Sequence, residues 1–120
     1  PRLKAYIDVV RNCGDNATCY VTKLEAKDLS TRMKTALLLA RGIAPGKETY
    51  AALLNAYRAS SPAETDYRRF LLMAMGRLGG SAQSGETAQA ADNQLTKGKG
   101  ERYWAEELRL LSMYLSTKAN

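Results

Sequence analysis

The segment Asp66-Tyr-Arg-Arg-Phe-Leu-Leu-Met-Ala-Met-Gly-Arg-Leu-Gly-Gly80 lies past the middle of a chain of 120 residues. At 3.6 residues per turn its apolar side chains cover most of the circumference of a helix, and the Gly-Gly pair is a typical helix stop. A helix that is apolar on more than one side has to pack against neighbours on more than one side. The segment therefore predicts a helix enclosed by other helices.

The pattern of this segment recurs at a spacing of 36 residues in both directions. Upstream, the matching positions are Arg32, Leu37, Ala40 and Arg41 against Arg68, Met73, Gly76 and Arg77. Downstream, the match is weaker and pairs Leu110, Leu111 and Ser112 with Ala74, Met75 and Gly76. A period of roughly 20 to 50 residues is typical of stacked repeats. We expect Ala40, Gly76 and Ser112 to be equivalent small residues that let adjacent helices approach closely.

The composition is that of one globular domain. Hydrophobic residues make up 45% of the chain and charged residues 25%, which is typical of a folded chain. No run reaches the roughly 18 apolar residues of a membrane span, so the sequence predicts none. Because the chain opens with Pro1 and not with Met, we expect a processed product or a piece of a longer protein.

Apolar residues recur at helical spacing along the rest of the chain, and no stretch alternates apolar and polar residues as a strand would. We expect about six to seven helices: one over residues 3–13, followed by paired units over 15–43, 47–80 and 84–117. The start signal Ser61-Pro-Ala-Glu64 precedes the central helix. The weakest expected helix runs from Glu86 to Lys97, because its apolar stripe is only Ala88, Ala91 and Leu95.

Two of the expected helices resemble the inner helix of a HEAT repeat, the two-helix unit of α-solenoids. The matching segments are Asp28-Leu-Ser-Thr-Arg32-Met-Lys-Thr-Ala36-Leu-Leu-Leu-Ala40-Arg41, and Glu64-Thr-Asp-Tyr-Arg68 with Gly76-Arg77. The resemblance implies an all-α fold, a short right-handed α-solenoid of stacked antiparallel helix pairs. In that family an acidic residue followed four positions later by Arg forms a ladder between repeats, which implies structural roles for Asp28, Arg32, Glu64 and Arg68.

The third unit departs from the ladder pattern. Gly100 and Trp104 stand where the acidic residue and the Arg are expected at the 36-residue spacing. We therefore expect the ladder to stop before this unit. The departure, together with the weak helix at its start, is typical of a terminal capping unit.

Cys13 and Cys19 flank the corner between the first two expected helices, and their state is left open by the sequence. A disulfide would close a loop of about 7 residues and stabilise the fold by about 2 kcal/mol. The alternatives are buried free thiols, or a redox pair, which would more typically be spaced Cys-x-x-Cys. With no histidine and only these two cysteines, a zinc site lacks ligands, and we expect no metal.

The stretch Cys13-Gly-Asp-Asn-Ala-Thr-Cys19-Tyr is also similar to one in repeat proteins of exported bacterial type. A bridged pair would place the protein in the periplasm or outside the cell, because disulfides persist in oxidising compartments. A pair of free thiols would place it in the cytoplasm.

The catalytic motifs that we considered are incomplete. Gly79-Gly-Ser-Ala-Gln83 lacks the second Gly of a nucleophile elbow, and the chain has no histidine to act as the base. Gly46-Lys-Glu48 lacks the upstream Gly and the Ser or Thr of a phosphate-binding loop. We therefore expect no enzymatic activity and no cofactor.

The charge balance favours an acidic partner, a nucleic acid or an anionic surface. Lys and Arg number 18 against 12 Asp and Glu, a formal charge of +6. Exposed basic residues on the inner helices are candidates for contact with another protein, or else solubilise an outer face: Lys34, Arg41, Arg69, Arg77 and Arg109. A protein-interaction or scaffold module is therefore the leading interpretation. Nucleic-acid binding along the same basic row is the alternative.

Overall fold

The computed structural model describes residues 11–43 and 47–119 of the chain, and these form α-helices joined by short turns. In chain order the helices are α2 (Ala17–Leu24), α3 (Leu29–Ala40), α4 (Lys47–Ala59), α5 (Thr65–Leu78), α6 (Ser84–Leu95) and α7 (Arg102–Ser116). Two short 3-10 helices, η1 (Ser81–Gln83) and η2 (Lys99–Glu101), precede α6 and α7. The described residues contain no strand, which confirms the all-α prediction. The predicted helix over 3–13 lies outside the described residues except for 11–13, which are helical.

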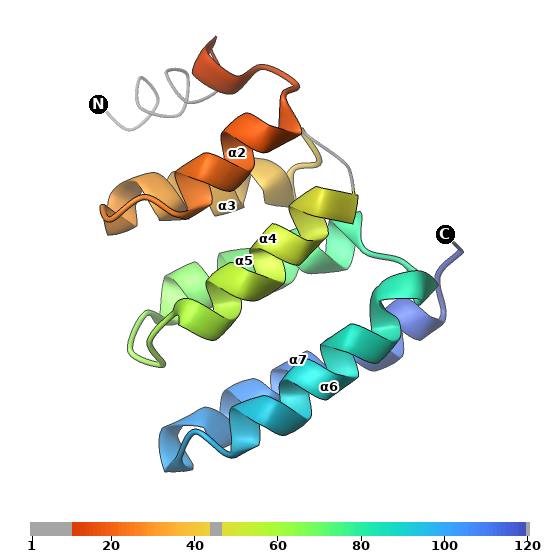
Figure 1. Cartoon of the computed structure of the whole chain (residues 1–120). Helices are drawn as coiled ribbons and strands as arrows, with labels where there is room; N and C mark the ends of the chain where they lie inside the picture. The colour runs from red at the N-terminus through yellow and green to blue at the C-terminus, as the bar shows by residue number, and fades with distance from the viewer. Residues whose placement is uncertain (1–10, 44–46, 120) are drawn as a thin grey trace.

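The helices form three antiparallel pairs that are stacked in chain order, α2 with α3, α4 with α5, and α6 with α7 (Figure 1). The first helices of the pairs, α2, α4 and α6, contact one another in sequence, and so do the second helices, α3, α5 and α7. The molecule measures 37 × 33 × 18 Å. The shortest dimension fits two layers of helices, whose axes pack roughly 8–10 Å apart.

Helix α5 lies at the centre of this arrangement. It packs against α4 within its own pair, against α3 on one side and against α7 on the other. Its buried side chains include Tyr67, Leu71, Ala74 and Met75, each at most 1% exposed. The expectation that this segment is enclosed by other helices is therefore confirmed.

The burial pattern of α5 recurs in α7, but displaced by 37 residues and not by the expected 36. Glu64 and Glu101 both immediately precede their helices, and buried Leu71 corresponds to buried Leu108 at the same displacement. Between α3 and α5 the spacing is 36, from the N-cap Asp28 to Glu64. The extra residue lies between the starts of α5 and α6, because α5 is two residues longer than α3 and the connection that follows it is one residue shorter. The prediction of one constant spacing was therefore wrong for the third pair.

The displacement also changes which small residue faces which neighbour. A Cβ atom added to Gly76 would lie 3.5 Å from Leu111 Cδ1, so Gly76 does lie in the contact between α5 and α7. Ser112 instead faces its own pair, and its hydroxyl donates a hydrogen bond of 2.9 Å to the carbonyl of Ser84. The predicted equivalence of Gly76 and Ser112 is wrong, since the residue that corresponds to Gly76 is Met113.

Helix α6 buries a face that matches the predicted stripe of Ala88, Ala91 and Leu95 only in part, since Ala91 is buried but Leu95 is not. Leu95 is 41% exposed, and the residues turned inward are Thr87, Ala90, Ala91 and Gln94. The hydroxyls of Thr87 and Tyr50 share a hydrogen bond that joins α6 to α4. The spacing of apolar side chains does not reveal this face, because two of its residues are polar and are buried with hydrogen-bond partners.

A disulfide joins Cys13 and Cys19 at the start of α2, with their Cα atoms 5.3 Å apart. The turn that it closes contains Gly14, whose φ of +56° favours glycine. Asn16 caps α2 by accepting a hydrogen bond of 3.1 Å from the backbone N–H of Cys19. The Tyr20 hydroxyl donates to the Gly14 carbonyl, so the turn is held by covalent and hydrogen bonds together.

Reduction of this disulfide is expected to lower the free energy of unfolding by about 2 kcal/mol, because the unfolded chain gains the freedom of a loop of about 7 residues. Urea unfolding with and without reductant measures the difference, and thiol counting under denaturing, non-reducing conditions should find no free thiol. A Cys13→Ala/Cys19→Ala variant is the matched control, since reductant should leave its stability unchanged. Two free thiols in the purified protein would contradict the bridge.

Candidate functional site

The guanidinium of Arg68 is fully buried between the second and third helix pairs. Its Nη1 donates to Glu101 at 2.7 Å and its Nη2 donates to the same carboxylate at 3.1 Å. Ser60 accepts from Nε through its hydroxyl and from Nη2 through its carbonyl, both at 2.8 Å. Every nitrogen of the guanidinium therefore has a partner, which a buried charge requires.

Two aromatic rings contact this guanidinium, and they also contact each other edge to face, with centroids 6.4 Å apart. The Arg68 Cζ atom lies 4.9 Å from the ring centroid of Tyr57 and 5.4 Å from that of Trp104, within the range of cation–π contact. Trp104 is 5% exposed, so it belongs to the core and not to a stacking surface. Burial raises the pKa of the Tyr57 hydroxyl, partly offset by the charge of Arg68.

A second ion pair joins the first and second helix pairs in the same way. Arg32 Nη2 donates to a carboxylate oxygen of Glu64 at 3.3 Å, and both side chains are about one-fifth exposed. The other oxygen of Glu64 accepts a hydrogen bond of 2.8 Å from the backbone N–H of Ser61. The start signal at Ser61 therefore forms a turn that orients Glu64, and α5 itself begins only at Thr65. Asp28 caps α3 by accepting from the backbone N–H groups of Ser30 and Thr31.

The expectation that the ladder stops before the third unit was wrong. Gly100 is not a ladder residue, but Glu101, one position later, takes the acidic place and binds Arg68. The cause is the 37-residue displacement of α7. At that displacement the residue corresponding to Arg68 is Ala105, so within the described residues the ladder has its last ion pair at Arg68 and Glu101.

The five basic candidates do not form one continuous row. Lys34 is half-buried on α3, and Arg41 is exposed directly after it. Arg69 is exposed and lies 3.6 Å from Asp66, which partly neutralises its charge. Arg109 turns toward the other layer and donates to Asp92 of α6 at 2.9 Å. Arg77, at the end of α5, is also exposed.

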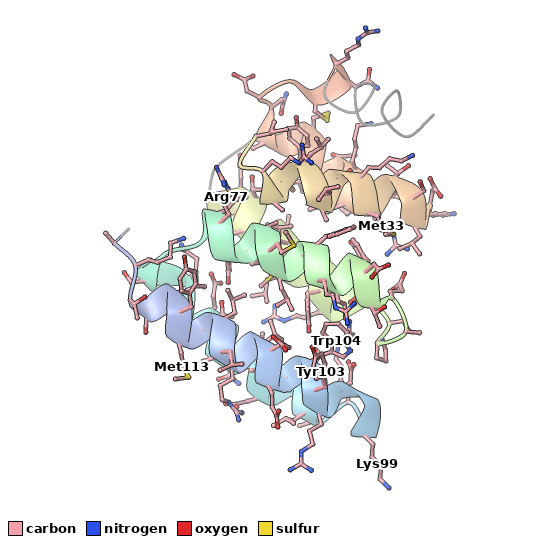
Figure 2. The ribbon with its side chains drawn as sticks, turned by 180° about the vertical axis from the view of Figure 1, so that it is seen from behind. Met33, Arg77, Lys99, Tyr103, Trp104 and Met113 are labelled. Atoms are coloured by element: carbon pink, nitrogen blue, oxygen red, sulfur yellow. A yellow bond between two sulfur atoms is a disulfide. The ribbon has the colours of Figure 1, made fainter. Side chains whose placement is uncertain are left out.

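Arg77 and the end of α3 lie close together. A Cβ atom added to Gly42 would lie 2.5 Å from Arg77 Nε, and Gly42 has a φ of +77°. The guanidinium therefore lies over the turn that follows Arg41, and it bridges the first and second pairs on this side. Figure 2 shows Arg77 at the C-terminal end of α5, beside the end of α3. Of the five candidates, the structure brings Arg41 and Arg77 to one edge.

The outward face of α3, α5 and α7 also carries an apolar row that the sequence reasoning did not single out. Each of these helices has an apolar residue nine positions after the residue that precedes the helix. These equivalent residues are Leu37, Met73 and Leu110. Leu37 is half-buried, whereas Met73 is 56% and Leu110 59% exposed. We call these three residues the outer apolar row. The signal was present in the sequence, because Leu37 and Met73 already matched at 36 residues.

More exposed apolar side chains lie on α7. Tyr103, Met113 and Tyr114 are each more than half exposed, and the last two flank the outer apolar row near the C-terminal end of the helix. Figure 2 shows Tyr103 and Met113 on this face. An exposed group of large apolar side chains marks an interaction surface more often than isolated ones do.

Within residues 11–43 and 47–119 no group of three or more His, Cys, Asp or Glu side chains could hold a metal ion. Across the same residues, none of the helices combines the length and the apolar character needed to span a membrane. No protein-family model, curated protein or solved structure matches the chain.

Replacing Arg68 by Leu is expected to lower the free energy of unfolding by about 3–5 kcal/mol, because it leaves the buried Glu101 carboxylate without its counter-charge. Urea unfolding followed by far-ultraviolet circular dichroism measures the loss. Arg69→Leu, one residue away but exposed, is the matched control and should change stability by less than about 0.5 kcal/mol. Equal effects of the two variants would contradict the role assigned to Arg68.

The same ion pair predicts a dependence of stability on pH. Burial alone would raise the pKa of Glu101, but its hydrogen bonds with Arg68 and Gln94 and the charge of Arg68 hold that pKa below the ordinary value of 4.5. A group with a lowered pKa in the folded state contributes stability above its unfolded pKa, and the contribution is lost as the pH falls through the folded pKa.

We therefore expect the stability difference between the native chain and Glu101→Gln to be largest near neutral pH and to shrink as the pH falls below about 4. Urea midpoints of both chains between about pH 7 and about pH 3 measure it. Subtracting the variant removes the contributions of the other carboxyl groups. A difference that stays constant over this range would contradict the lowered pKa.

Proposed function

We propose that the protein is a non-enzymatic interaction module that holds another protein against the outward face of α3, α5 and α7. The outer apolar row is the observation that supports this proposal best. Three apolar residues at equivalent places on three successive helices form a line, and two of them are more than half exposed. Met residues are adaptable contacts on binding surfaces, which suits a partner segment lying across the helices.

We further propose that the stacked pairs are HEAT-like units of a short right-handed α-solenoid, of which α6 and α7 form a terminal capping unit. The contacts of α3 with α5 and of α5 with α7, and the two Arg–Glu pairs at equivalent places, support this reading. Solenoids use their long curved surfaces to bind other macromolecules. The absence of an Arg at Ala105 is consistent with an end of the ladder.

Charge distribution favours a protein partner over a nucleic acid. Of the five basic candidates, Arg69 and Arg109 are paired with carboxylates, so they contribute little free positive charge. A phosphate-binding surface would instead need several free cations along one path. The formal charge of +6 and the Arg41–Arg77 edge suit a partner that carries acidic groups next to an apolar segment.

The disulfide bears on where this function takes place. We propose an oxidising compartment, the periplasm or the cell exterior, because the Cys13–Cys19 bridge would not persist among the reduced thiols of the cytoplasm.

The test is capture of a partner by the immobilised chain, followed by the same capture with Met73→Glu/Leu110→Glu. Charges in the apolar row are expected to reduce the bound partner at least about tenfold, because central interface residues contribute about 2 kcal/mol or more. Leu95→Glu is the matched control, since Leu95 is also exposed and apolar but lies on α6 in the other layer. A partner retained equally by the double variant and the control would contradict the proposed face.

The basic edge is tested in the same assay with Arg41→Glu/Arg69→Glu/Arg77→Glu. Loss of a protein partner is expected, and higher salt should partly restore it, because the three Glu side chains repel an acidic partner and salt screens that repulsion. Binding of duplex or single-stranded nucleic acid at low salt, abolished by this triple variant but not by the apolar-row variant, would favour the nucleic-acid alternative.

A further inference from the structure

A cleft of about 610 Å³ lies between the first and second helix pairs. Its walls come from the end of α2 and the turn after it, from the small residues of α4, and from Arg32 and Tyr67. Its volume falls within the roughly 300–1,000 Å³ of sites that hold small molecules or single side chains. None of the residues of the outer apolar row lines it.

The corresponding place between the second and third pairs is filled by the chain itself. There the ring of Tyr57 covers one face of Arg68, and the hydroxyl and carbonyl of Ser60 accept hydrogen bonds from its nitrogens. Both acceptors are uncharged. Glu101 and the ring of Trp104 complete the surroundings.

Arg32 has only half of these partners. Glu64 supplies the carboxylate, and the ring of Tyr67 lies 4.9 Å from Arg32 Cζ in the place of Trp104. Tyr57 lies seven residues before Glu64, and Val21 lies seven residues before Asp28, so Val21 corresponds to Tyr57. Ser60 lies four residues before Glu64, and Leu24 lies four residues before Asp28, so Leu24 corresponds to Ser60. Both residues line the cleft and offer neither a ring nor a side-chain acceptor.

Two polar groups at this wall lack a full set of partners. Within the described residues the Arg32 side chain donates to Glu64 through Nη2, while Arg68 uses all three of its nitrogens. The Tyr67 hydroxyl is buried, and among the described residues it has no hydrogen-bond acceptor, since its neighbour Arg32 can only donate. A buried hydroxyl without an acceptor is destabilising, so an acceptor placed beside it would be favoured.

We propose that the cleft binds an aromatic side chain of a peptide segment that also presents an uncharged acceptor oxygen. The ring takes the place that Tyr57 has on Arg68, and the acceptor takes the place of Ser60. A carboxylate is not favoured, because Glu64 already neutralises Arg32 and the other two charged residues of the lining, Glu25 and Lys27, balance each other. The small side chains Ala52 and Ala56 leave the space that the ring occupies.

The test is a titration of the isotope-labelled chain with N-acetylphenylalaninamide, followed by NMR shifts of backbone amides. Shifts are expected at Val21, Leu24, Asn55 and Ala56, which line the cleft. N-acetylleucinamide should bind about fivefold more weakly, because it cannot make the cation–π contact with Arg32. N-acetylphenylalanine, with a free carboxylate, should also bind more weakly. No shifts at these amides, or equal binding of all three compounds, would overturn the proposal.

Two variants test the site itself. Val21→Tyr introduces the missing ring on the chain and is expected to abolish binding while the unfolding temperature stays the same or rises. Arg32→Lys keeps the charge but removes the planar group, and should weaken binding about fivefold. Arg69→Lys, outside the cleft, is the control and should bind like the native chain. Undiminished binding by Val21→Tyr would overturn the location.

A last comparison separates a peptide from a free aromatic compound. An acetylated and amidated pentapeptide with Phe between Ala residues should bind at least as tightly as N-acetylphenylalaninamide. Exclusion of the pentapeptide, with binding of the free amide, would overturn the assignment to a peptide. These titrations do not involve the outer apolar row, so their outcome is independent of the partner-capture experiment.

Discussion

The arrangement of the last two helix pairs depends on the burial of one positive charge. A guanidinium at Arg68 can be removed from water only if its nitrogens find hydrogen-bond partners and its charge finds a counter-charge. Those partners, and the two rings that contact it, come from α4, from the turn after α4, from Glu101 and from α7. Moving any of these elements would leave a buried charge unsatisfied, so the requirement fixes α4, α5 and α7 relative to one another. Lys118 fixes the far end of α7, since its Nζ donates to the Gly76 carbonyl at 2.7 Å.

The first and second pairs meet in the same way but less completely. Arg32 keeps the carboxylate and one ring, and in place of the second ring and the uncharged acceptors the chain has a cleft. The filled contact stabilises the fold. In the function that we propose, the open contact and the outer apolar row bind other molecules. The ion pairs between the helix pairs hold α3, α5 and α7 in place, so the outward face of these helices can carry exposed Met and Leu side chains without a change in the fold.

The helices and their pairing could be predicted from the sequence because they depend on local apolar periodicity and on turn residues. The pairing of Arg32 with Glu64 could be suspected because both recur at 36 residues. What failed was the third unit, where a single extra residue shifts Glu101 into the place expected for Gly100 and turns Ser112 toward Ser84. An insertion of one residue turns a helix by about 100° and is invisible to a search at fixed spacing. The cleft could not be predicted from the sequence. It lies where Val21 lacks the ring that Tyr57 has, and where Leu24 lacks the side-chain acceptor that Ser60 has.

The starts of α4 and α6 lie 37 residues apart, and this spacing defines the segment that a duplication would have to copy. The stretch from Lys47 to Gln83 is one whole period, and it carries both the acceptor Glu64 and the donor Arg68. A tandem copy of it would bind the original Arg68 through its own Glu64 and present its own Arg68 to Glu101. If the pairs are solenoid units, as we propose, duplication of this one segment would lengthen the molecule and leave the contacts at both of its ends unchanged.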